Sequence, residues 1–316
     1  MSKLYAALAA MCLILISCGS ANADKGPLSL VTYSKKAGVA YRVLVDAHHA
    51  YLANNDGVAI FDVHQPERPR KIGELPLGVT FGVCVENGLA YVSSGSRLTV
   101  WDVHYPANPC RLAECAVGNE IQNVWLDGPY AYVPGDRGVH ILDVRDPGSM
   151  MPVARCGEGS ARSVAVRDGI AYVAMPAAGV VVMDVSNPAS PRQIATVSGT
   201  KGAWDLHLHE SQLYVACHGA GIRILTLSDK ETPRVIGGYR DNDGGEALSV
   251  WGDGHYLYVA DNYGIEVLDV SDPANPRELA GYGGLSGAHD LFVDGSFIYV
   301  AEAKKGLIIF ELKQNK

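Results

Sequence analysis

The sequence lacks an excess of positive charge. Its 26 Lys and Arg residues are outnumbered by 34 Asp and Glu residues, which leaves a formal net charge of -8. Proteins that hold a nucleic-acid backbone neutralise its phosphates with clustered Lys and Arg side chains. We therefore expect no nucleic-acid partner. The acidic balance also argues mildly against an anionic ligand, unless local charge in the loops overrules it.

Helical periodicity is missing as well. Beyond residue 27, no stretch combines apolar residues at helical spacing with capping residues at its ends. A parallel βα barrel needs a helix in every unit and is therefore disfavoured. The composition is nevertheless that of a folded globular protein, with 48% hydrophobic and 19% charged residues.

Linear motifs of catalysis are also absent. The sequence has no GxSxG, no HExxH, no P-loop, no GxGxxG in a βαβ setting and no CxxC. Enzymes can also build active sites from scattered side chains, so an enzyme stays an alternative to a binding protein.

The N-terminal segment has the features of an export signal. Lys3 precedes an apolar run, Leu4–Ile16, which is shorter than the roughly 20 residues of a membrane-spanning helix. The run ends in Leu15-Ile16-Ser17-Cys18, which resembles the bacterial lipobox. This resemblance implies cleavage before Cys18 and acylation of its thiol; an ordinary signal peptide is the alternative. We expect a lipoprotein signal peptide at residues 1–17, a lipidated tether at 18–26 and a folded domain at 27–316.

Five further cysteines show neither CxxC nor zinc-ligand spacing: Cys84, Cys110, Cys115, Cys156 and Cys217. We interpret them as small buried thiols at strand positions. A disulfide between Cys110 and Cys115 is the alternative, since export would permit one.

A repeat occupies the rest of the chain. A Tyr-centred apolar tetrad returns at intervals of 40 to 44 residues, at Tyr51, Tyr91, Tyr132, Tyr172, Tyr214, Tyr258 and Tyr299. In each unit a short apolar stretch and a turn precede the tetrad, and a Gly-Val-x-Ile-x-Asp-Val segment and a Pro-rich turn follow it. Seven such units cover the mature chain.

Each unit predicts four antiparallel strands, because its short segments are rich in Val, Ile and Tyr and are separated by Gly, Pro, Asn and Asp. Seven units of four strands predict an all-β, seven-bladed β-propeller. The last unit stops at Leu312 after three strands, whereas residues 27–33 resemble a fourth strand with no unit before it. We expect these two segments to pair and close the ring, which removes an exposed sheet edge.

The third segment of the units resembles the LVIVD-repeat family, as in residues 139–144 and 180–185. The resemblance covers about residues 27–312. It implies a β-propeller in an exported or surface-attached bacterial protein and carries over no catalytic motif. Thr226 and Glu311 depart from the pattern, because the other units have Asp at this position.

Comparison of the units separates scaffold from site. The recurring residues are assigned to packing and turns: the tetrad Tyr, the Asp at 62, 102, 143, 184 and 269, and the Pro at 69, 109, 191, 233 and 276. The loops between fourth and first strands, and between second and third strands, differ strongly between units. We expect both sets on one face around the central channel, where variable loops on a rigid frame favour recognition.

One position near the start of the first strand is polar or Gly in every unit: Arg42, Gly82, Asn123, Ser163, Asp205, Ser249 and Asp290. Strand alternation places these residues on a common side, where they either coordinate a ligand or hold ordered water. Neighbouring Tyr41, Trp204 and His289 add aromatic surface that suits a sugar, a peptide or a flat organic ligand. The candidate binding residues are Arg42, Asn123, Arg162, Trp204, Asp205, His218, His289 and Asp290.

Metal binding has two candidates. Asp241, Asp243 and Glu246 lie in a segment that resembles a fragment of a calcium loop, but the EF-hand spacing is incomplete and a solvated acidic turn is favoured. His207, His209 and His218 cluster in the fifth unit, yet their positions do not favour a shared metal. We expect no cofactor, with calcium as the alternative.

These observations favour a non-catalytic platform that binds a protein or a glycan at the bacterial envelope. The alternatives are a propeller hydrolase or lyase with its site at the channel mouth, and a purely structural envelope component. We expect the chain to be lipid-anchored to a bacterial membrane, on its periplasmic or cell-surface side. Its tether joins the closing strand away from the variable loops, so these loops are expected to point away from the membrane.

Overall fold

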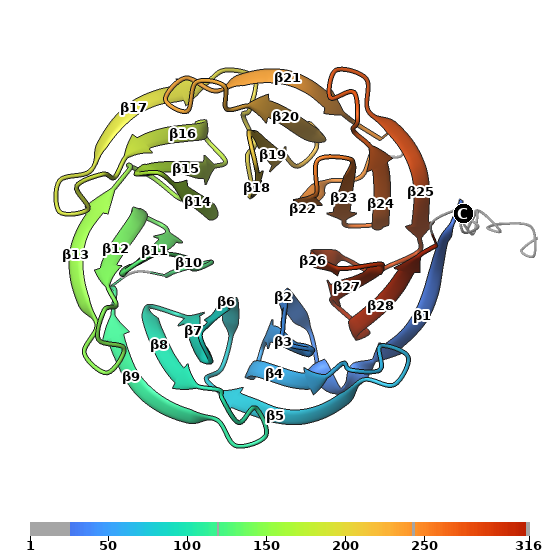
Figure 1. Ribbon diagram of the computed structural model, residues 1–316, viewed down its shortest axis with the longest axis horizontal. Helices are drawn as coiled ribbons and strands as arrows, with labels where there is room; N and C mark the ends of the chain where they lie inside the picture. Colours follow the sequence, from blue (N-terminus) through green and yellow to red (C-terminus); the bar gives the residue numbers. More distant parts are fainter. Residues whose placement is uncertain (1–25, 119, 242–243, 314–316) are drawn as a thin grey trace, which may run out of the picture.

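The computed structural model describes residues 26–118, 120–241 and 244–313. These residues form 28 strands and one short 3-10 helix, η1 (Lys35–Ala37). The strands make seven antiparallel four-stranded sheets, arranged as blades around a central axis (Figure 1). The seven-bladed β-propeller predicted from the repeat is therefore confirmed.

Blades are numbered along the chain, and their strands are given from the axis outward. Blade 1 contains β2 (Ala40–Asp46), β3 (His49–Asn54), β4 (Gly57–Asp62) and β5 (Arg70–Pro76). Blade 2 contains β6 (Thr80–Glu86), β7 (Leu89–Ser94), β8 (Arg97–Asp102) and β9 (Cys110–Ala116). Blade 3 contains β10 (Trp125–Asp127), β11 (Tyr130–Gly135), β12 (Gly138–Asp143) and β13 (Met151–Cys156).

The other blades follow the same plan. Blade 4 contains β14 (Ser163–Arg167), β15 (Ile170–Met175), β16 (Gly179–Asp184) and β17 (Arg192–Val197). Blade 5 contains β18 (Asp205–His209), β19 (Gln212–Ala216), β20 (Ile222–Thr226) and β21 (Arg234–Tyr239). Blade 6 contains β22 (Ala247–Gly252), β23 (Tyr256–Asp261), β24 (Gly264–Asp269) and β25 (Arg277–Gly283).

In the described part of the chain, no helix is long and apolar enough to cross a membrane.

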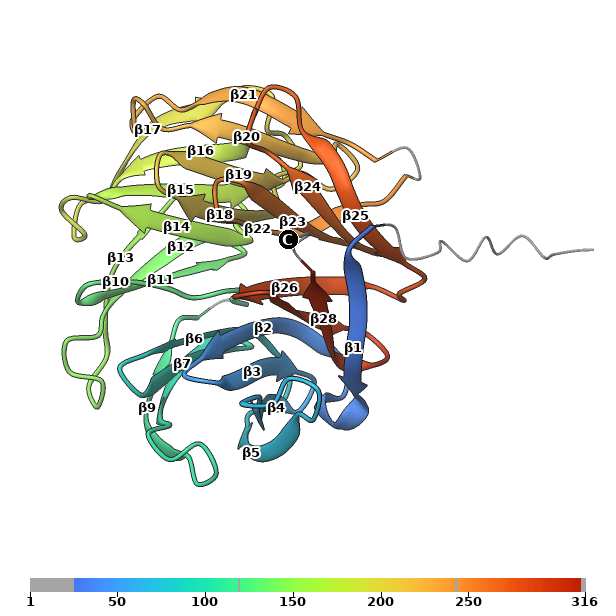
Figure 2. The same ribbon diagram turned by 45° about the vertical axis from the view of Figure 1, so that its right-hand side comes forward.

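Blade 7 closes the ring with strands from both ends of the chain. It contains β26 (Ala288–Asp294), β27 (Phe297–Glu302), β28 (Gly306–Leu312) and, as its outer strand, β1 (Leu28–Ser34). β1 pairs antiparallel with β28, with Leu28 opposite Leu312 and Ser34 opposite Leu307. Figure 2 shows β1 running along the outer edge of this blade. The expected closure is confirmed.

The two faces of the ring follow from this connectivity. Loops between the outer strand of one blade and the inner strand of the next emerge on the same face as the loops between second and third strands; we call it the mouth face. β28 begins there and ends at Leu312, which pairs with Leu28. The chain therefore enters β1 from the opposite face. The expected signal peptide, residues 1–17, and the lipid attachment residue Cys18 lie outside the described residues.

The hydrophobic core is divided into seven clusters, which lie mainly between adjacent blades. One cluster joins Leu52 and Phe61 of blade 1 to Tyr299 and Ile309 of blade 7, so packing as well as strand pairing seals the ring. The tetrad tyrosines are buried in these clusters, and four of them are among the largest fully buried side chains: Tyr132, Tyr172, Tyr214 and Tyr299. Their assignment to packing is confirmed.

The recurring Asp residues stabilise the turn after the third strand. In five blades the carboxylate accepts a hydrogen bond from the backbone N–H two residues later, as from His64 to Asp62 at 3.1 Å. This bond, together with Arg70, lowers the pKa of Asp62 to about 2. In blade 5 the hydroxyl of Thr226 replaces the carboxylate and accepts from the N–H of Ser228 at 3.3 Å. The departure noted at Thr226 therefore preserves the turn.

The five cysteines of the described ranges are free, and their interpretation as buried thiols is only partly right. Cys156 and Cys217 are buried, Cys84 and Cys115 are half-buried, and Cys110 is exposed. Cys110 and Cys115 both lie on β9, the outer strand of blade 2, which faces solvent. Five residues along a strand span roughly 16 Å, whereas a disulfide needs Cα atoms within about 7 Å. The alternative disulfide is therefore wrong.

Substitutions in the closing strand test the ring. Leu28 is 2% exposed and packs in the core between blades 6 and 7, whereas Leu30 on the same strand is 38% exposed. We expect Leu28→Ala to lower the free energy of unfolding by about 2–5 kcal/mol. The matched control Leu30→Ala should change it by less than about 1 kcal/mol. Urea unfolding measures both, and equal losses would argue against closure by β1.

Candidate binding site at the mouth of the central channel

The first residues of the seven inner strands form successive tiers around the channel. Equivalent positions give a mouth tier, one half-buried residue per blade: Tyr41, Phe81, Gln122, Arg162, Trp204, Leu248 and His289. The next residue of each blade is the polar or glycine position identified in the sequence, and we call these seven residues the polar ring: Arg42, Gly82, Asn123, Ser163, Asp205, Ser249 and Asp290. Two residues further on, side chains again face the channel and form a lower tier that includes Leu44, Cys84, Trp125, His207, Trp251 and Phe292.

A β-bulge places the mouth residue in four blades. The second strand opposes the residues on either side and skips one residue of the inner strand: Tyr41, Phe81, Leu248 and His289. In the other three blades the mouth residue precedes the inner strand, by one residue at Arg162 and Trp204 and by three at Gln122, and its N–H donates once to the second strand, as from Trp204 to Ala216 at 2.8 Å. A bulge interrupts alternation and redirects a side chain. The extra residue therefore adds a layer of side chains above the polar ring.

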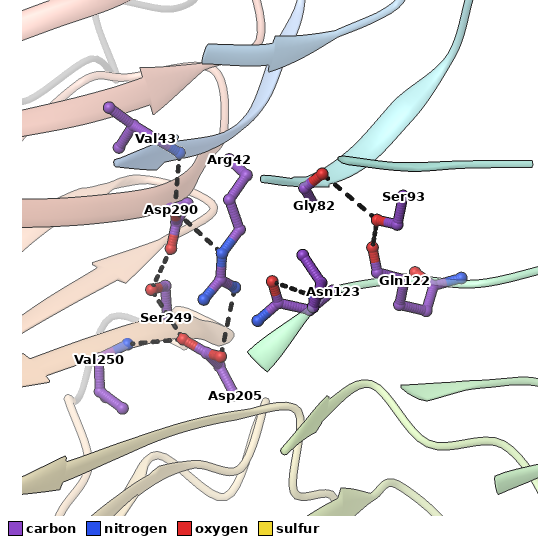
Figure 3. A network of polar contacts seen from close by, with 11 residues as sticks. Arg42, Val43, Gly82, Ser93, Gln122, Asn123, Asp205, Ser249, Val250 and Asp290 are labelled. Carbon is purple, nitrogen blue, oxygen red and sulfur yellow. Dashed lines mark hydrogen bonds and ion pairs between the residues drawn. The ribbon is translucent and has the colours of Figure 1, made fainter. Parts of the chain in front are cut away.

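Below the mouth, Arg42 binds two buried carboxylates, Asp290 of the adjacent blade 7 and Asp205 of blade 5 across the channel (Figure 3). Its Nη1 lies 3.4 Å from Oδ1 of Asp205, and its Nε lies 3.6 Å from Oδ2 of Asp290. Side chains of the two acids are 5% and 4% exposed, against 26% for Arg42. Asp290 also accepts the N–H of Val43 at 2.8 Å. Strands of blades 1, 5 and 7 are thus linked across the channel.

Ser249 joins the two acids and makes their protonation interdependent. Its Oγ lies 2.9 Å from Asp205 and 2.6 Å from Asp290. A hydroxyl has one hydrogen, so it donates to only one carboxylate. The second contact is satisfied when the other carboxyl carries a proton and donates to Oγ. Burial raises the pKa of Asp290 to about 6 against the opposing effect of Arg42, and the neighbouring Asp205 adds to the rise.

The charge of Arg42 is stabilised by the same geometry. Burial alone would lower its pKa, but Asp290 and Asp205 raise it above the usual value. When Asp290 carries a proton, one guanidinium faces one remaining negative charge and the group approaches electrical neutrality. Removing one partner of such a buried group typically costs about 3–5 kcal/mol, because a charge is left without compensation.

The polar ring is not a uniform circle. Asn123 turns its Oδ1 to the N–H of Val124 at 2.8 Å rather than to another ring member. At Gly82, a Cβ would lie 2.6 Å from the carbonyl oxygen of Gln122 and 2.7 Å from the Cα of Asn123. Glycine is therefore required there, because blade 3 packs directly against blade 2 at this point.

Above Arg42 the mouth opens into a cavity of about 320 Å³. All seven residues of the mouth tier line it, together with Arg42, Asn123 and Asp205. On one side, Tyr41 stacks on His289 with ring centroids 5.5 Å apart and contacts Phe81 at 5.2 Å. Its hydroxyl donates to Asn55, and His289 donates to the carbonyl of Ala40, so both rings are held in place.

Blades 4 and 5 also line the cavity: blade 4 contributes the Arg162 side chain and blade 5 contributes the Trp204 ring. The guanidinium carbon of Arg162 lies 4.5 Å from the Trp204 ring centroid, and the His218 ring lies 4.1 Å from it. His218 also approaches Glu246 at 3.7 Å. Burial lowers the pKa of His218, while Glu246 opposes this. The rings leave a cleft with apolar walls and a polar floor.

The lower tier narrows the channel into a second cavity of about 180 Å³. His207 packs on Trp251 at 5.1 Å, and burial lowers the pKa of this histidine to about 4, so it is neutral at pH 7. Burial raises the pKa of the Cys84 thiol to about 12, which keeps it protonated and unreactive. This tier therefore forms an apolar base beneath the polar ring.

The candidate residues chosen from the sequence gather at this place. Six line the mouth cavity: Arg42, Asn123, Arg162, Trp204, Asp205 and His289. Asp290 lies beneath them and holds Arg42, while His218 packs behind Trp204. Phe81, Gln122 and Leu248 also line the mouth cavity and were not among the residues predicted from the sequence. The position immediately before the polar ring in each unit is the signal that would have found them.

The acidic segment does not form a described metal site. Asp243 lies outside the described residues, while the N–H of Glu246 donates to Asn262 and its carboxylate faces His218. Among described residues, no group of three or more His, Cys, Asp or Glu is arranged to hold a metal ion.

Stability as a function of pH tests the shared proton. A carboxyl whose pKa rises on folding stabilises the native state below its unfolded pKa, near 4, and loses this effect as the pH approaches 6. Asp290→Asn mimics the protonated form, so we expect the variant to fold and to lack this component. Its unfolding free energy relative to wild type should grow between pH 4 and 6 by up to about 1.4 kcal/mol per unit. A difference that does not change with pH in urea unfolding would contradict the shared proton.

Comparison with known proteins identifies the repeat. The model of the LVIVD repeat family matches residues 118–157, 158–198, 244–283 and 287–310. These stretches correspond to blades 3, 4 and 6 and to the three inner strands of blade 7. The expected LVIVD repeats are therefore confirmed in these blades. A comparison with curated proteins found no match.

Solved structures share the fold at low sequence identity. The RRP9 WD40 repeats superpose with a TM-score of 0.75 at 12% identity, covering 92% of this chain and 100% of that one. The Cps50 (Swd1) β-propeller domain of Myceliophteria thermophila gives 0.71 at 10% identity, covering 91% and 100%. The computationally designed Ika8 protein gives 0.65 at 8% identity, covering 90% and 99%. At these identities the likeness concerns the fold alone, and the chain is a β-propeller that carries LVIVD repeats.

Proposed function

We propose that this protein is a non-catalytic binding platform whose mouth cavity recognises a protein or a glycan of the bacterial envelope. The observation that carries the proposal is the mouth tier. Each blade contributes one side chain from an equivalent backbone position, and these side chains differ in type, from Tyr41 and Trp204 to Gln122 and Arg162. Packing requirements common to all blades do not account for such differences, whereas recognition of an asymmetric ligand does.

The state of the two buried acids favours binding over catalysis. A general acid or base must reach the proton that it transfers. Both oxygens of Asp290 are engaged by Ser249, Val43 and Arg42, and both oxygens of Asp205 lie near Arg42, Ser249 or Val250. These carboxyls link the inner strands of different blades, and we assign them a structural role beneath the binding surface.

Affinity capture tests the platform. The chain from Asp24 onward, which contains every described residue, is immobilised and exposed to envelope extract. We expect Trp204→Ala and His289→Ala to reduce the retained partner at least about tenfold, because central aromatic side chains dominate recognition. Mass spectrometry and glycan analysis identify what is retained.

The matched control is Tyr105→Ala. Tyr105 is 79% exposed and follows the third strand of blade 2, on the face opposite the mouth. It should retain the partner at the wild-type level. Circular dichroism and thermal unfolding verify that all variants are folded. Equal capture by the mouth variants and wild type would refute the proposed site.

We further propose that Cys18 is acylated and anchors the chain to a bacterial membrane, outside the cytoplasm. Entry of the chain into β1 from the face opposite the mouth supports an orientation in which the mouth points away from this membrane. From Gly19 to Gly26 the tether spans at most about 28 Å. This length is enough to separate the propeller from the lipid surface.

Removal of the thiol tests the anchor. Cys18→Ala should abolish incorporation of labelled fatty acid into the chain, because the thiol that would carry the acyl group is missing. The control Ser20→Ala should remain labelled. Protease and antibody access on spheroplasts report orientation, and mouth loops shielded while the opposite face is open would contradict it.

A further inference from the structure

The hydrogen-bonding capacity left over at the mouth consists mainly of donors. The acceptor oxygens of Asp205 and Asp290 already face Arg42, Ser249 and backbone N–H groups. By contrast, Nη2 of Arg42 has no partner among the described residues. Nδ2 of Asn123 is likewise unpaired in the described ranges, since only Oδ1 of this amide is bonded. A ligand seated on this floor must therefore supply acceptors.

Arg162 adds a cation that lacks a counter-ion. It lines the cavity and lies over Trp204, but no carboxylate of the described residues is within 4.0 Å of its guanidinium nitrogens. Its Nε is buried and unpartnered, as are Oγ of Ser160, two residues earlier in the chain, and Nε2 of His218, whose ring contacts Trp204. Arg42 is balanced by two acids, whereas Arg162 is not. At its end of the cavity, the unpaired guanidinium of Arg162 therefore favours an anionic group of the ligand, in spite of the net charge of -8.

The walls of the cavity restrict the shape of that anion. Tyr41, Phe81 and His289 lie on one side, and Trp204 lies with Arg162 at the other. Aromatic faces favour flat or ring-shaped partners that cover them. A volume of about 320 Å³ is at the small end of ligand pockets, which suits one or two six-membered rings.

We propose that the mouth cavity binds a carboxylate carried on a six-membered ring, and that this ring is an acidic sugar residue, a hexuronate, of an envelope glycan. The inference rests on the proposed binding function and narrows its ligand. Arg162 binds the carboxylate, since guanidinium and carboxylate form charge-assisted paired hydrogen bonds. The sugar hydroxyls accept hydrogen bonds from Arg42 and Asn123 on the floor, and the aromatic rings that line the cavity enclose the sugar ring. A carboxylate alone would leave the floor donors of blades 1 and 3 unused, which favours a hydroxylated ring over an aromatic acid.

Calorimetric titration with three small compounds tests the inference. A hexuronate, its neutral hexose and benzoate are titrated at equal ionic strength into the chain from Asp24 onward. We expect the hexuronate to bind, the hexose to bind at least roughly tenfold more weakly, and benzoate to be weaker than the hexuronate. Arg162→Gln should weaken hexuronate binding by roughly tenfold or more and leave hexose binding nearly unchanged.

Arg145→Gln is the matched control. Arg145 also lies over an aromatic ring, that of Tyr130, at 6.0 Å, but it follows the third strand of blade 3 on the face opposite the mouth. It should bind the hexuronate as wild type does. Asn123→Ala, which removes a floor donor, provides a second variant should Arg162→Gln fail to fold.

Each outcome decides the inference. Equal binding of hexose and hexuronate, or an Arg162→Gln variant that binds the hexuronate normally, would overturn the carboxylate assignment. Benzoate as strong as the hexuronate would overturn the assignment to a sugar. If none of the three binds while the envelope capture still yields a partner that is lost with Trp204→Ala, the inference fails and the platform stands. Failure of the capture as well would remove the platform itself.

Discussion

Pairing of β1 with β28 is the constraint on which the whole arrangement depends. A circle of seven sheets with one outer strand missing would present the backbone donors and acceptors of β28 to solvent, and would leave blades 7 and 1 joined only by side-chain contacts. The first strand of the chain satisfies those groups and adds Leu28 to the core. Closure also fixes the radius of the ring. Without it, Arg42 in blade 1 would not be held within reach of Asp205 in blade 5.

The contacts across the channel then convert a ring of similar blades into one asymmetric object. Adjacent blades are joined by apolar packing, which is much the same at every interface. The Arg42 group instead links four blades, because the hydroxyl of Ser249 in blade 6 lies between the carboxyls of blades 5 and 7. Because the two buried acids depend on this guanidinium for charge compensation, Arg42 is required at the floor of the cavity. The side chains that differ between blades lie in the mouth tier above this floor, where they are half-buried and make few hydrogen bonds that the fold requires.

The fold was predictable because the same pattern of strand and turn residues recurs in seven units. The recurrence of the tetrad, the Asp turn and the Pro-rich turn identified the blade, and the unmatched strands at the two ends identified closure. Even Thr226, which replaces the recurring Asp in blade 5, accepts the same hydrogen bond from the backbone N–H two residues later. The cysteines were less predictable. Exposure of Cys110 depends on the outer strand facing solvent, and apolar composition alone does not reveal which side of an outer strand is covered.

The candidate site was predictable only in part, for a reason that lies in backbone geometry. Alternation along a strand correctly placed Arg42, Asp205 and Asp290 on one side, but strict alternation turns their predecessors away from the channel. The bulge at Tyr41, Phe81, Leu248 and His289 breaks this rule and adds a second channel-facing residue. Aromatic residue type suggested a role for some of these positions, and it gave no such signal for Leu248 or Gln122.

This same bulge explains how a rigid frame can carry a changeable surface. A bulged residue is skipped by its partner strand, so its side chain is not packed against a cross-strand neighbour and its identity is not tied to strand register. The residues on either side, such as Ala40 and Arg42, keep the pairing and the buried network. Substitution of Tyr41 therefore alters the cavity wall at little cost to the blade, whereas substitution of Arg42 removes a cation from between two buried acids. The proposed recognition surface and the stabilising network are therefore separated by a single residue along the chain, as at Tyr41 and Arg42 or at His289 and Asp290.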